Sequence, residues 1–533
     1  MAPDEVCLTY YAIGPNKVLQ PTSLTRAELW QLSRQAAGFL KSNGVGRGDR
    51  VLHFFSDNRM EDVAFRLGAS MVGAVPVTVN WQADTEARVV YKATSTSAKL
   101  AVCDAGVPAK HCTALREASV EVVTAAAALA KATPLPAEQF EPQVELEDDR
   151  VIIFTSGTTG QPKGVRLPYR AYDCNRSTFE SFLALEDPTL KLACVLANPF
   201  HHTNSTAISD WCLRRPGSHL HILQRYSTGY WAALTRVASG DTTDVNDEIN
   251  NDDDESVVSA CVRACGASAA HGLRVVAPLV SKHFDFLEAL MEEARGAETS
   301  GGEVSAAKRA KAHDGSAVPL EAPNGEQEAR KESGQSTSST ARPARSVFGM
   351  PHGAVSAALG SSHVTLLLGS SPVGPATIKR IQSYANGALP TVRFGSTETC
   401  LQVVGTPHVQ HAPEIDKAAI LKAFQRGWAH TVCSGGNSSS AGSSSSTSED
   451  SSSSGAEGER VAQPGYYIGR AHPPFVECLV VESVDASAGE AYLKPVPEGV
   501  PGLLITRGCN LMSGYTNDQE VKLMLRGICS FQS

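Results

Sequence analysis

Hydrophobic and polar positions between residues 22 and 104 follow two alternating periods, one typical of helices and one typical of strands. A capping box at Thr25 and Glu28 opens the first helical pattern, whose apolar positions are Leu29, Leu32, Ala36 and Leu40. The pattern then predicts strands at 50–55, 75–79 and 100–103 and helices at 59–72 and 84–94. Because strands separated by helices pair in parallel, we expect an α/β fold of layered, largely parallel sheets with flanking helices.

Three segments interrupt this pattern. Residues 241–256 are acidic and rich in Asn, residues 295–346 have few large apolar side chains, and residues 434–459 are dominated by Ser and Gly. None of them can bury enough surface to offset the entropy of ordering, so we expect disordered surface insertions. Mis-predicted introns are the alternative origin of these segments.

Composition and charge argue against several classes of protein, including nucleic-acid-binding and membrane-spanning proteins. The net charge of −9 comes almost entirely from residues 241–255, which hold eight acids and no Lys or Arg. The remainder is nearly neutral, which argues against nucleic acid as a partner. No apolar run reaches the length of a membrane span, and the N-terminus does not have the pattern of a signal peptide. The 13 Cys are scattered without a disulfide framework, so we expect a reducing, cytoplasmic location, with an organelle as the alternative.

The segment 154–164 carries the strongest chemical signal. It follows the apolar run Val151–Phe154 and combines glycines, hydroxyls and Lys163. Glycines allow close backbone approach, while hydroxyls, N–H groups and a lysine attract an anion. The order differs from a Walker loop, so a polar hairpin turn is the alternative interpretation. The residues predicted to contact phosphate are Thr155, Ser156, Gly157, Thr158, Thr159, Gly160 and Lys163.

A second motif lies at 392–399. Phe394 offers a stacking face for a base, Gly395 gives clearance, and the Thr397 hydroxyl and Glu398 carboxylate suit a hard cation such as Mg²⁺. The alternative is an ordinary surface turn after a strand. We therefore treat Thr397 and Glu398 as candidate metal ligands.

Both motifs, in this order, closely resemble those of the adenylate-forming superfamily, which includes acyl-CoA synthetases, aryl-CoA ligases, luciferases and peptide-synthetase adenylation domains. The resemblance implies ATP and Mg²⁺ as cofactors and CoA as acyl acceptor, and it implies that Lys163, Thr397 and Glu398 are the catalytic residues. It also assigns nucleotide contacts to two segments. The first consists of Gly369, Ser370, Ser371 and Pro372, and the second of Arg393, Phe394, Gly395, Ser396 and Thr397. For the first segment, an ordinary strand-to-helix turn is the alternative interpretation.

The sequence Pro199-Phe200-His201-His202 resembles a further core motif of the superfamily, in which an aromatic residue or His lines the acyl pocket. Both histidines are therefore candidate substrate-binding residues, and His202 is preferred for the pocket. A zinc site is less well supported, because no further ligands recur at a useful spacing.

The resemblance extends over nearly the whole chain, so residues 1–533 are predicted to form an AMP-binding core with a β-rich third subdomain at about 400–533. Leu503 replaces the Glu that is usual in that region. After Gly514-Tyr515 the ribose-binding Asp, hinge and catalytic lysine of the superfamily do not follow. We therefore expect the small C-terminal domain to be absent and the chain to be an incomplete form.

The implied activity is ATP-dependent conversion of a small or medium carboxylic acid to an acyl-adenylate, followed by transfer to CoA. A catalytically silent protein that binds ATP or an acyl-adenylate is one alternative. The other is an adenylation domain that loads a carrier protein.

Overall fold

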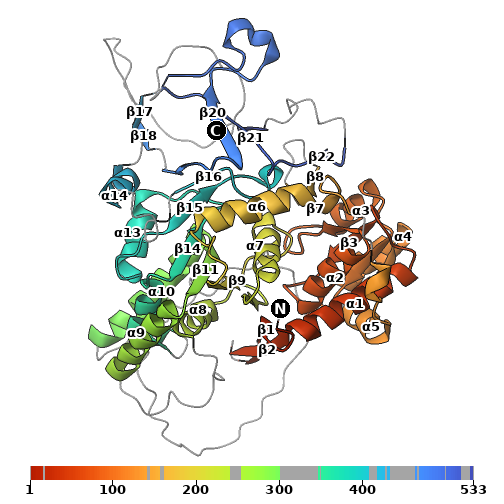
Figure 1. Cartoon of the computed structure of the whole chain (residues 1–533), viewed down its shortest axis with the longest axis horizontal. Helices are drawn as coiled ribbons and strands as arrows, with labels where there is room; N and C mark the ends of the chain where they lie inside the picture. The colour runs from red at the N-terminus through yellow and green to blue at the C-terminus, as the bar shows by residue number, and fades with distance from the viewer. Residues whose placement is uncertain are drawn as a thin grey trace, which may run out of the picture.

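The computed structural model describes residues 2–15, 18–140, 144–155, 161–240, 254–299, 346–347, 350–406, 408, 417–426, 429–431, 462–464, 467–497, 500–517 and 529–531. Two large sheets with helices between and around them form most of this part of the chain (Figure 1). The predicted fold class of layered, largely parallel sheets is confirmed.

The first sheet has the strand order β22-β8-β7-β4-β3-β5-β6, in which β7, β4, β3, β5 and β6 run parallel and β8 runs antiparallel to β7. Its strands are β3 (Arg50–Phe54), β4 (Val75–Thr78), β5 (Leu100–Cys103), β6 (Glu121–Thr124), β7 (Asp149–Thr155), β8 (Lys163–Pro168) and β22 (Gly514–Tyr515). The accompanying helices are α1 (Arg26–Ser42), α2 (Met60–Met71), α3 (Glu86–Ser95), α4 (Ala109–Glu117) and α5 (Ala125–Lys131), with a 3₁₀ turn η2 (Ala137–Gln139).

Local chemistry explains where these elements begin. The predicted capping box is confirmed, because the Thr25 hydroxyl accepts from the Glu28 backbone N–H and the Glu28 carboxylate accepts from the Thr25 N–H at 2.8 Å. Helix α3 starts two residues later than predicted, because Thr85 is its N-cap. Asp84 lies outside the helix and forms an ion pair with Lys92.

The second sheet has the order β19-β16-β15-β14-β11-β9-β10-β1-β2, with a parallel centre from β15 to β1. Its strands are β1 (Val6–Ile13), β2 (Leu19–Thr25), β9 (Lys191–Leu196), β10 (His219–Leu223), β11 (Leu273–Leu279), β14 (Val364–Leu368), β15 (Thr391–Phe394), β16 (Val404–Gly405) and β19 (Arg470–Ala471). The helices that lie between its strands in the sequence are α7 (Thr203–Arg214), α8 (Gly229–Ser239), α9 (Asp254–Ala270), α10 (Ser281–Thr299), α12 (His352–Leu359) and α13 (Pro375–Tyr384).

A buried layer separates the two sheets. It contains α7 together with α6 (Tyr169–Phe182), which runs across the middle of Figure 1, above α7. Phe179 of α6 and Trp211 of α7 pack in one apolar cluster with Ile153 of the first sheet and Leu196 of the second. The opposite face of the second sheet is covered by α8, whose Trp231 is fully buried. The two sheets therefore hold α6 and α7 between them.

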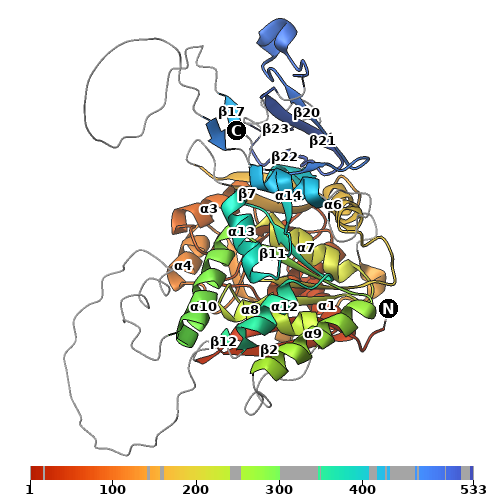
Figure 2. The same ribbon diagram turned by 90° about the vertical axis from the view of Figure 1, so that its left-hand side faces the viewer.

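The rest of the described chain is mostly β-structure. The strands β17 (Ala429–Thr431), β18 (Ala462–Pro464), β20 (Val476–Val481), β21 (Leu503–Gly508) and β23 (Cys529–Phe531) lie at one end of the molecule (Figure 2). The short pair β12 (Ser346–Val347) and β13 (Met350–Pro351) lies away from that end, beside α8 and α12. The remaining elements are helix α14 (Lys417–Arg426) and the turns η3 (Thr397–Thr399) and η4 (Ala486–Ala491). Most of the three predicted insertions lies outside the described residues, although α9 begins at Asp254 and α10 extends to Thr299.

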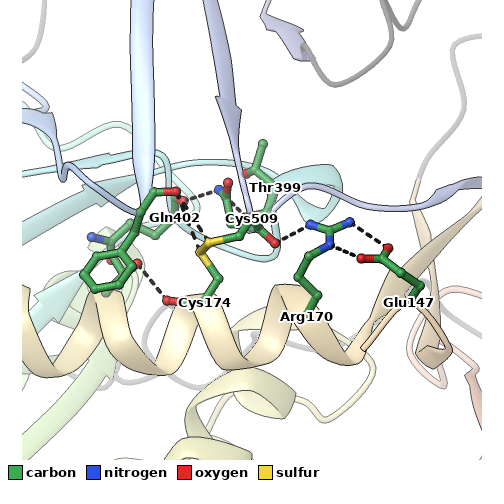
Figure 3. The surroundings of a disulfide bond; sticks show 9 residues. Glu147, Arg170, Cys174, Thr399, Gln402 and Cys509 are labelled. Atoms are coloured by element: carbon green, nitrogen blue, oxygen red, sulfur yellow. Dashed lines mark hydrogen bonds and ion pairs between the residues drawn. A yellow bond between two sulfur atoms is a disulfide. The ribbon is translucent and has the colours of Figure 1, made fainter. Parts of the chain in front are cut away.

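A disulfide joins Cys174 of α6 to Cys509, which follows β21 (Figure 3). The same helix contributes Arg170, which donates to the Cys509 carbonyl at 2.5 Å and pairs with Glu147. The sequence analysis did not predict this bond, because two cysteines 335 residues apart have no diagnostic spacing. The disulfide and Arg170 therefore link the C-terminal β-structure to α6.

In the described part of the chain, no helix is both long enough and apolar enough to cross a bilayer.

The histidines of β10 make the stability of this fold sensitive to acid. The rings of His219 and His221 stack at 3.9 Å, and Thr9 of β1 bonds His219 Nε2 at 2.8 Å. Burial and the nearby Arg26 lower the pKa of His219 to about 4, and burial and His219 lower that of His221. In the unfolded chain a histidine has a pKa near 6.5. Because both folded-state pKa values are lower, folding favours the neutral rings. Their contribution to the free energy of unfolding is complete above pH 6.5 and is lost as the pH falls towards 4.

We therefore expect the melting temperature to fall as the pH is lowered from 6.5 towards 4. His219→Gln should make this fall shallower, because one of the groups that resist protonation is gone. Thermal melts of both proteins between pH 7.5 and 4.5 measure the difference. Identical pH profiles would contradict this assignment.

Candidate active site

The parallel centre of the second sheet places five segments at one edge, because parallel strands end on the same side. These segments follow β9, β10, β11, β14 and β15, and they include the histidine motif, the 369–372 segment and the 395–398 motif. The segment after β3 meets this edge from the first sheet. There Asn58 donates to the carbonyls of Asn198 and Leu223, and Gln224 donates to Asp57 at 2.7 Å. The carboxyl ends of both sheets therefore face one region.

Lys163 begins β8 and lies opposite Thr155 in the antiparallel pair with β7. The segment between them therefore connects two antiparallel strands, as the hairpin interpretation expects, and its phosphate contacts stay a prediction. Its central residues, Ser156, Gly157, Thr158, Thr159 and Gly160, lie outside the described residues.

Tyr515 of β22 connects Lys163 to the second motif. The Lys163 Nζ atom lies 5.5 Å from the centre of the Tyr515 ring, and the Tyr515 hydroxyl donates to Glu398 Oε1 at 3.1 Å. Gly164 allows this approach, because a Cβ there would lie 2.6 Å from the Thr516 hydroxyl. Two predicted catalytic residues are therefore brought together by a residue that has no assigned role in the sequence analysis.

Glu398 lies in the tight turn η3 between β15 and β16. Gly395 is required there, since a Cβ would come within 2.3 Å of the Leu401 carbonyl. Cys400 and Leu401 have positive φ values of 46° and 93°, a costly conformation for residues with side chains. Asn510 stabilises the turn by donating to the carbonyls of Thr399 and Gln402 at 3.0 and 2.9 Å, beside the disulfide (Figure 3).

The donor set suits Mg²⁺ held jointly with phosphate. Glu398 supplies a carboxylate and Thr397 a hydroxyl, which are hard oxygen donors. Among the described residues, no group of three or more His, Cys, Asp or Glu is placed to hold a metal alone. A metal at this turn would therefore take most of its remaining ligands from ATP and water, as Mg²⁺ commonly does.

The 369–372 segment is the predicted strand-to-helix turn, with Pro375 at the start of α13. Ser371 bonds the Ser281 N–H and hydroxyl at 3.3 and 3.2 Å, and the Ser281 hydroxyl donates to the Pro372 carbonyl at 2.9 Å. A Cβ on Gly369 would lie 3.0 Å from Arg393 Cγ, so this segment passes directly over the side chain of Arg393.

The histidine loop is held by the first sheet's subdomain. Phe200 N–H donates to Asn58 at 3.0 Å, and Arg66 donates to the Phe200 carbonyl at 3.2 Å. His201 is 6% exposed and neither of its ring nitrogens has a hydrogen-bond partner, whereas His202 is solvent-exposed. Their rings lie 4.3 Å apart. A buried polar atom without a hydrogen-bond partner lowers the stability of the fold. The environment of His201 therefore favours a ligand that forms a hydrogen bond with its ring.

Lys92 is a buried cation near this loop, paired with Asp84 and placed 5.0 Å from the Phe154 ring at the end of β7. Burial lowers the pKa of His201, partial desolvation of the ring lowers that of His202, and the positive charge of Lys92 lowers both further. The two rings are therefore neutral at pH 7 and can donate and accept hydrogen bonds.

Sequence reasoning missed several residues that hold the site. Tyr515 lies in a motif that resembles the superfamily, so a signal was present. Lys92, Arg66 and Asn510 lie in ordinary helical or loop sequence, which gives no indication of their contacts.

Comparison with known proteins supports the resemblance. Residues 1–238 match the family model described as AMP-binding enzyme. A segment of 227 residues is 30% identical to 4-coumarate–CoA ligase 3 of Oryza sativa subsp. japonica and covers 40% of each chain. A segment of 147 residues is 32% identical to tyrocidine synthase 2 of Brevibacillus parabrevis, covering 28% of this chain and 4% of that protein. The match to the rice ligase thus spans less than half of that relative's length.

Solved structures extend the likeness to the rest of the chain. ATP-bound MatB from Rhodopseudomonas palustris superposes with a TM-score of 0.57 at 17% identity, covering 99% of this chain and 72% of that one. O-Succinylbenzoate CoA synthetase from Bacillus subtilis, in complex with its acyl-adenylate intermediate, gives 0.55 at 14% identity with the same coverage. At these identities the likeness concerns the fold. Residues 1–238 are therefore similar to the AMP-binding enzyme family, and the chain as a whole has the fold seen in these two solved structures.

Proposed function

We propose that this protein activates a carboxylic acid with ATP. A carboxylate oxygen attacks the α-phosphorus, the bond from that phosphorus to the bridging oxygen of the β-phosphate breaks, and acyl-adenylate and pyrophosphate form. The thiol of CoA then attacks the acyl carbon, loses its proton, and displaces AMP.

The observation that carries the proposal is that Tyr515 contacts both residues, with Lys163 over its ring and Glu398 at its hydroxyl. A cation and a carboxylate placed this close suit Mg-ATP, whose phosphates attract the ammonium and whose metal attracts the carboxylate. Bound Mg²⁺ would neutralise charge on the phosphates during the displacement. Lys163 and the hairpin would hold the terminal phosphates, and Tyr515 would orient Glu398.

We assign the remaining candidate residues to binding of the adenine base and of the carboxylic acid substrate. The segments 369–372 and 394–397 would pass the adenine, with Phe394 as its stacking partner. His201 and His202 would contact the acid, since they lie at the same edge as neutral hydrogen-bonding rings. CoA is the proposed acceptor because the ligase relatives are named for it, while a carrier protein is the alternative.

We expect the purified chain to exchange labelled pyrophosphate into ATP only when a suitable carboxylic acid is present. A panel of aliphatic and aromatic acids, assayed with Mg²⁺, measures this, and chelation by EDTA should abolish it. If ATP binds while no acid supports exchange, the silent-binding alternative replaces this proposal.

A further inference from the structure

We infer that Arg393 binds a second anionic group of the substrate, so that the acid activated here is a dicarboxylic acid. The inference rests on the proposed function and adds the substrate class to it. It reassigns Arg393, which the resemblance to the superfamily placed among the nucleotide contacts.

The first observation is that Arg393 is buried without a counterion. It is 3% exposed, its Nη2 donates to the Asn204 amide oxygen at 2.6 Å, and its Nε has no partner. No carboxylate in the described part of the chain pairs with it. Burial lowers its pKa to about 9, which still leaves the guanidinium charged at pH 7. A buried charge without a partner is strongly unfavourable.

The other buried arginines are the internal comparison. Arg66 pairs with Asp62 at 2.9 Å, Arg150 with Asp210 at 3.2 Å, and Arg215 with Glu180 at 3.5 Å. All three are at most 8% exposed. The protein thus compensates a buried guanidinium with a carboxylate in each of these cases, and Arg393 differs from them in that respect.

The position of Arg393 indicates what supplies the missing charge. Its guanidinium reaches Asn204, two residues beyond His202 and next to Thr203, whose buried hydroxyl also has no partner. Arg393 and Phe394 are consecutive in a strand, so their side chains project from opposite faces of the sheet. If Phe394 stacks on the base, Arg393 faces away from it, towards the loop assigned to the acid. An anion on the acid itself therefore fits better than a phosphate of ATP.

The first test needs no turnover. Arg393→Met removes the unpaired charge while keeping the length of the side chain, so the ligand-free protein should melt about 2–4 °C higher. Arg215→Met is the matched control, because it removes a buried arginine that is paired with Glu180 and should lower the melting temperature. A comparable fall in both variants would show that Arg393 has a structural partner and would overturn the inference.

The second test concerns ligands. With Mg²⁺ and α,β-methylene-ATP present, butanedioate, pentanedioate or benzene-1,4-dicarboxylate should raise the melting temperature of the wild type more than butanoate, pentanoate or benzoate. Arg393→Met should lose this difference, and Arg393→Lys should keep part of it. Two results would overturn the inference. One is an equal rise in the melting temperature of the wild type with each dicarboxylic acid and its monocarboxylic counterpart. The other is weaker nucleotide binding by Arg393→Met.

Pyrophosphate exchange separates this inference from the proposed function. We expect the wild type to prefer one of the dicarboxylic acids by roughly 100-fold in kcat/KM, and Arg393→Met to abolish that preference. Exchange with monocarboxylic acids alone would overturn the inference and leave the proposed function standing. Absence of exchange with every acid, together with an Arg393-dependent thermal shift for a dicarboxylate, would overturn the proposed function and leave the inference standing.

Discussion

Glu398→Gln is expected to lower acid-dependent pyrophosphate exchange by roughly 10²- to 10³-fold with every acid that supports it. The reason is that the amide cannot offer a negative charge to the metal that ATP brings to the turn. Lys163→Ala should act in the same direction, because it removes a positive charge from the phosphates. Initial exchange rates at saturating ATP measure both effects.

Three comparisons make this result specific. Glu477→Gln is the same substitution in an exposed ion pair with Arg507 and should leave exchange unchanged. Tyr515→Phe should cause a smaller loss, about tenfold, since it removes one hydrogen bond to a charged group. His202→Ala should change which acids are accepted instead of lowering all equally. Full activity in Glu398→Gln would show that the metal and the phosphates are placed elsewhere.

Asp62→Ala is expected to be the most destabilising of the substitutions considered, at about 3–5 kcal/mol. Asp62 is 3% exposed and accepts from Arg66 at 2.9 and 3.2 Å and from His53 at 2.7 Å. Burial acts to raise the pKa of Asp62, but Arg66 and His53 outweigh it and hold the pKa below its usual value. Removing the carboxylate leaves Arg66 buried and unpaired.

The control is Asp148→Ala, which breaks a pair with Arg47 that is about one-third exposed on each side. Such pairs contribute at most about 1 kcal/mol. Urea denaturation of the two variants gives the comparison. Because Arg66 also donates to the Phe200 carbonyl, Asp62→Ala should disturb the histidine loop as well. Equal losses of stability in both variants would show that the buried cluster does not stabilise the fold as described.

Local periodicity explains why so much of the fold could be predicted. The elements between residues 26 and 103 follow from capping residues and apolar repeats that lie within a few positions of one another. The start of α3 differs from the prediction for a local reason. Thr85 is the N-cap of this helix, and Asp84 forms an ion pair with Lys92 outside it. The two motif segments were likewise recognisable because each is contiguous.

Contacts between distant segments could not be predicted in this way. The Tyr515–Glu398 bond joins residues 117 positions apart, the Arg393–Asn204 bond 189, and the disulfide 335. The charge state of the histidines also depends on Lys92, which reaches them only in the folded chain. Sequence pattern therefore identified the candidate chemistry, whereas the residues that position it, and the unpaired charge of Arg393, emerged from the tertiary structure.

The central claim is that a carboxylate oxygen of the acid attacks the α-phosphorus of ATP. The most direct measurement uses an acid that supports exchange, labelled with ¹⁸O in its carboxylate, incubated with the protein, Mg-ATP and CoA. Mass spectrometry then locates the label in the products. The account predicts one ¹⁸O atom in AMP and none in pyrophosphate. Label in inorganic phosphate, or acid-dependent cleavage of ATP to ADP, would contradict it.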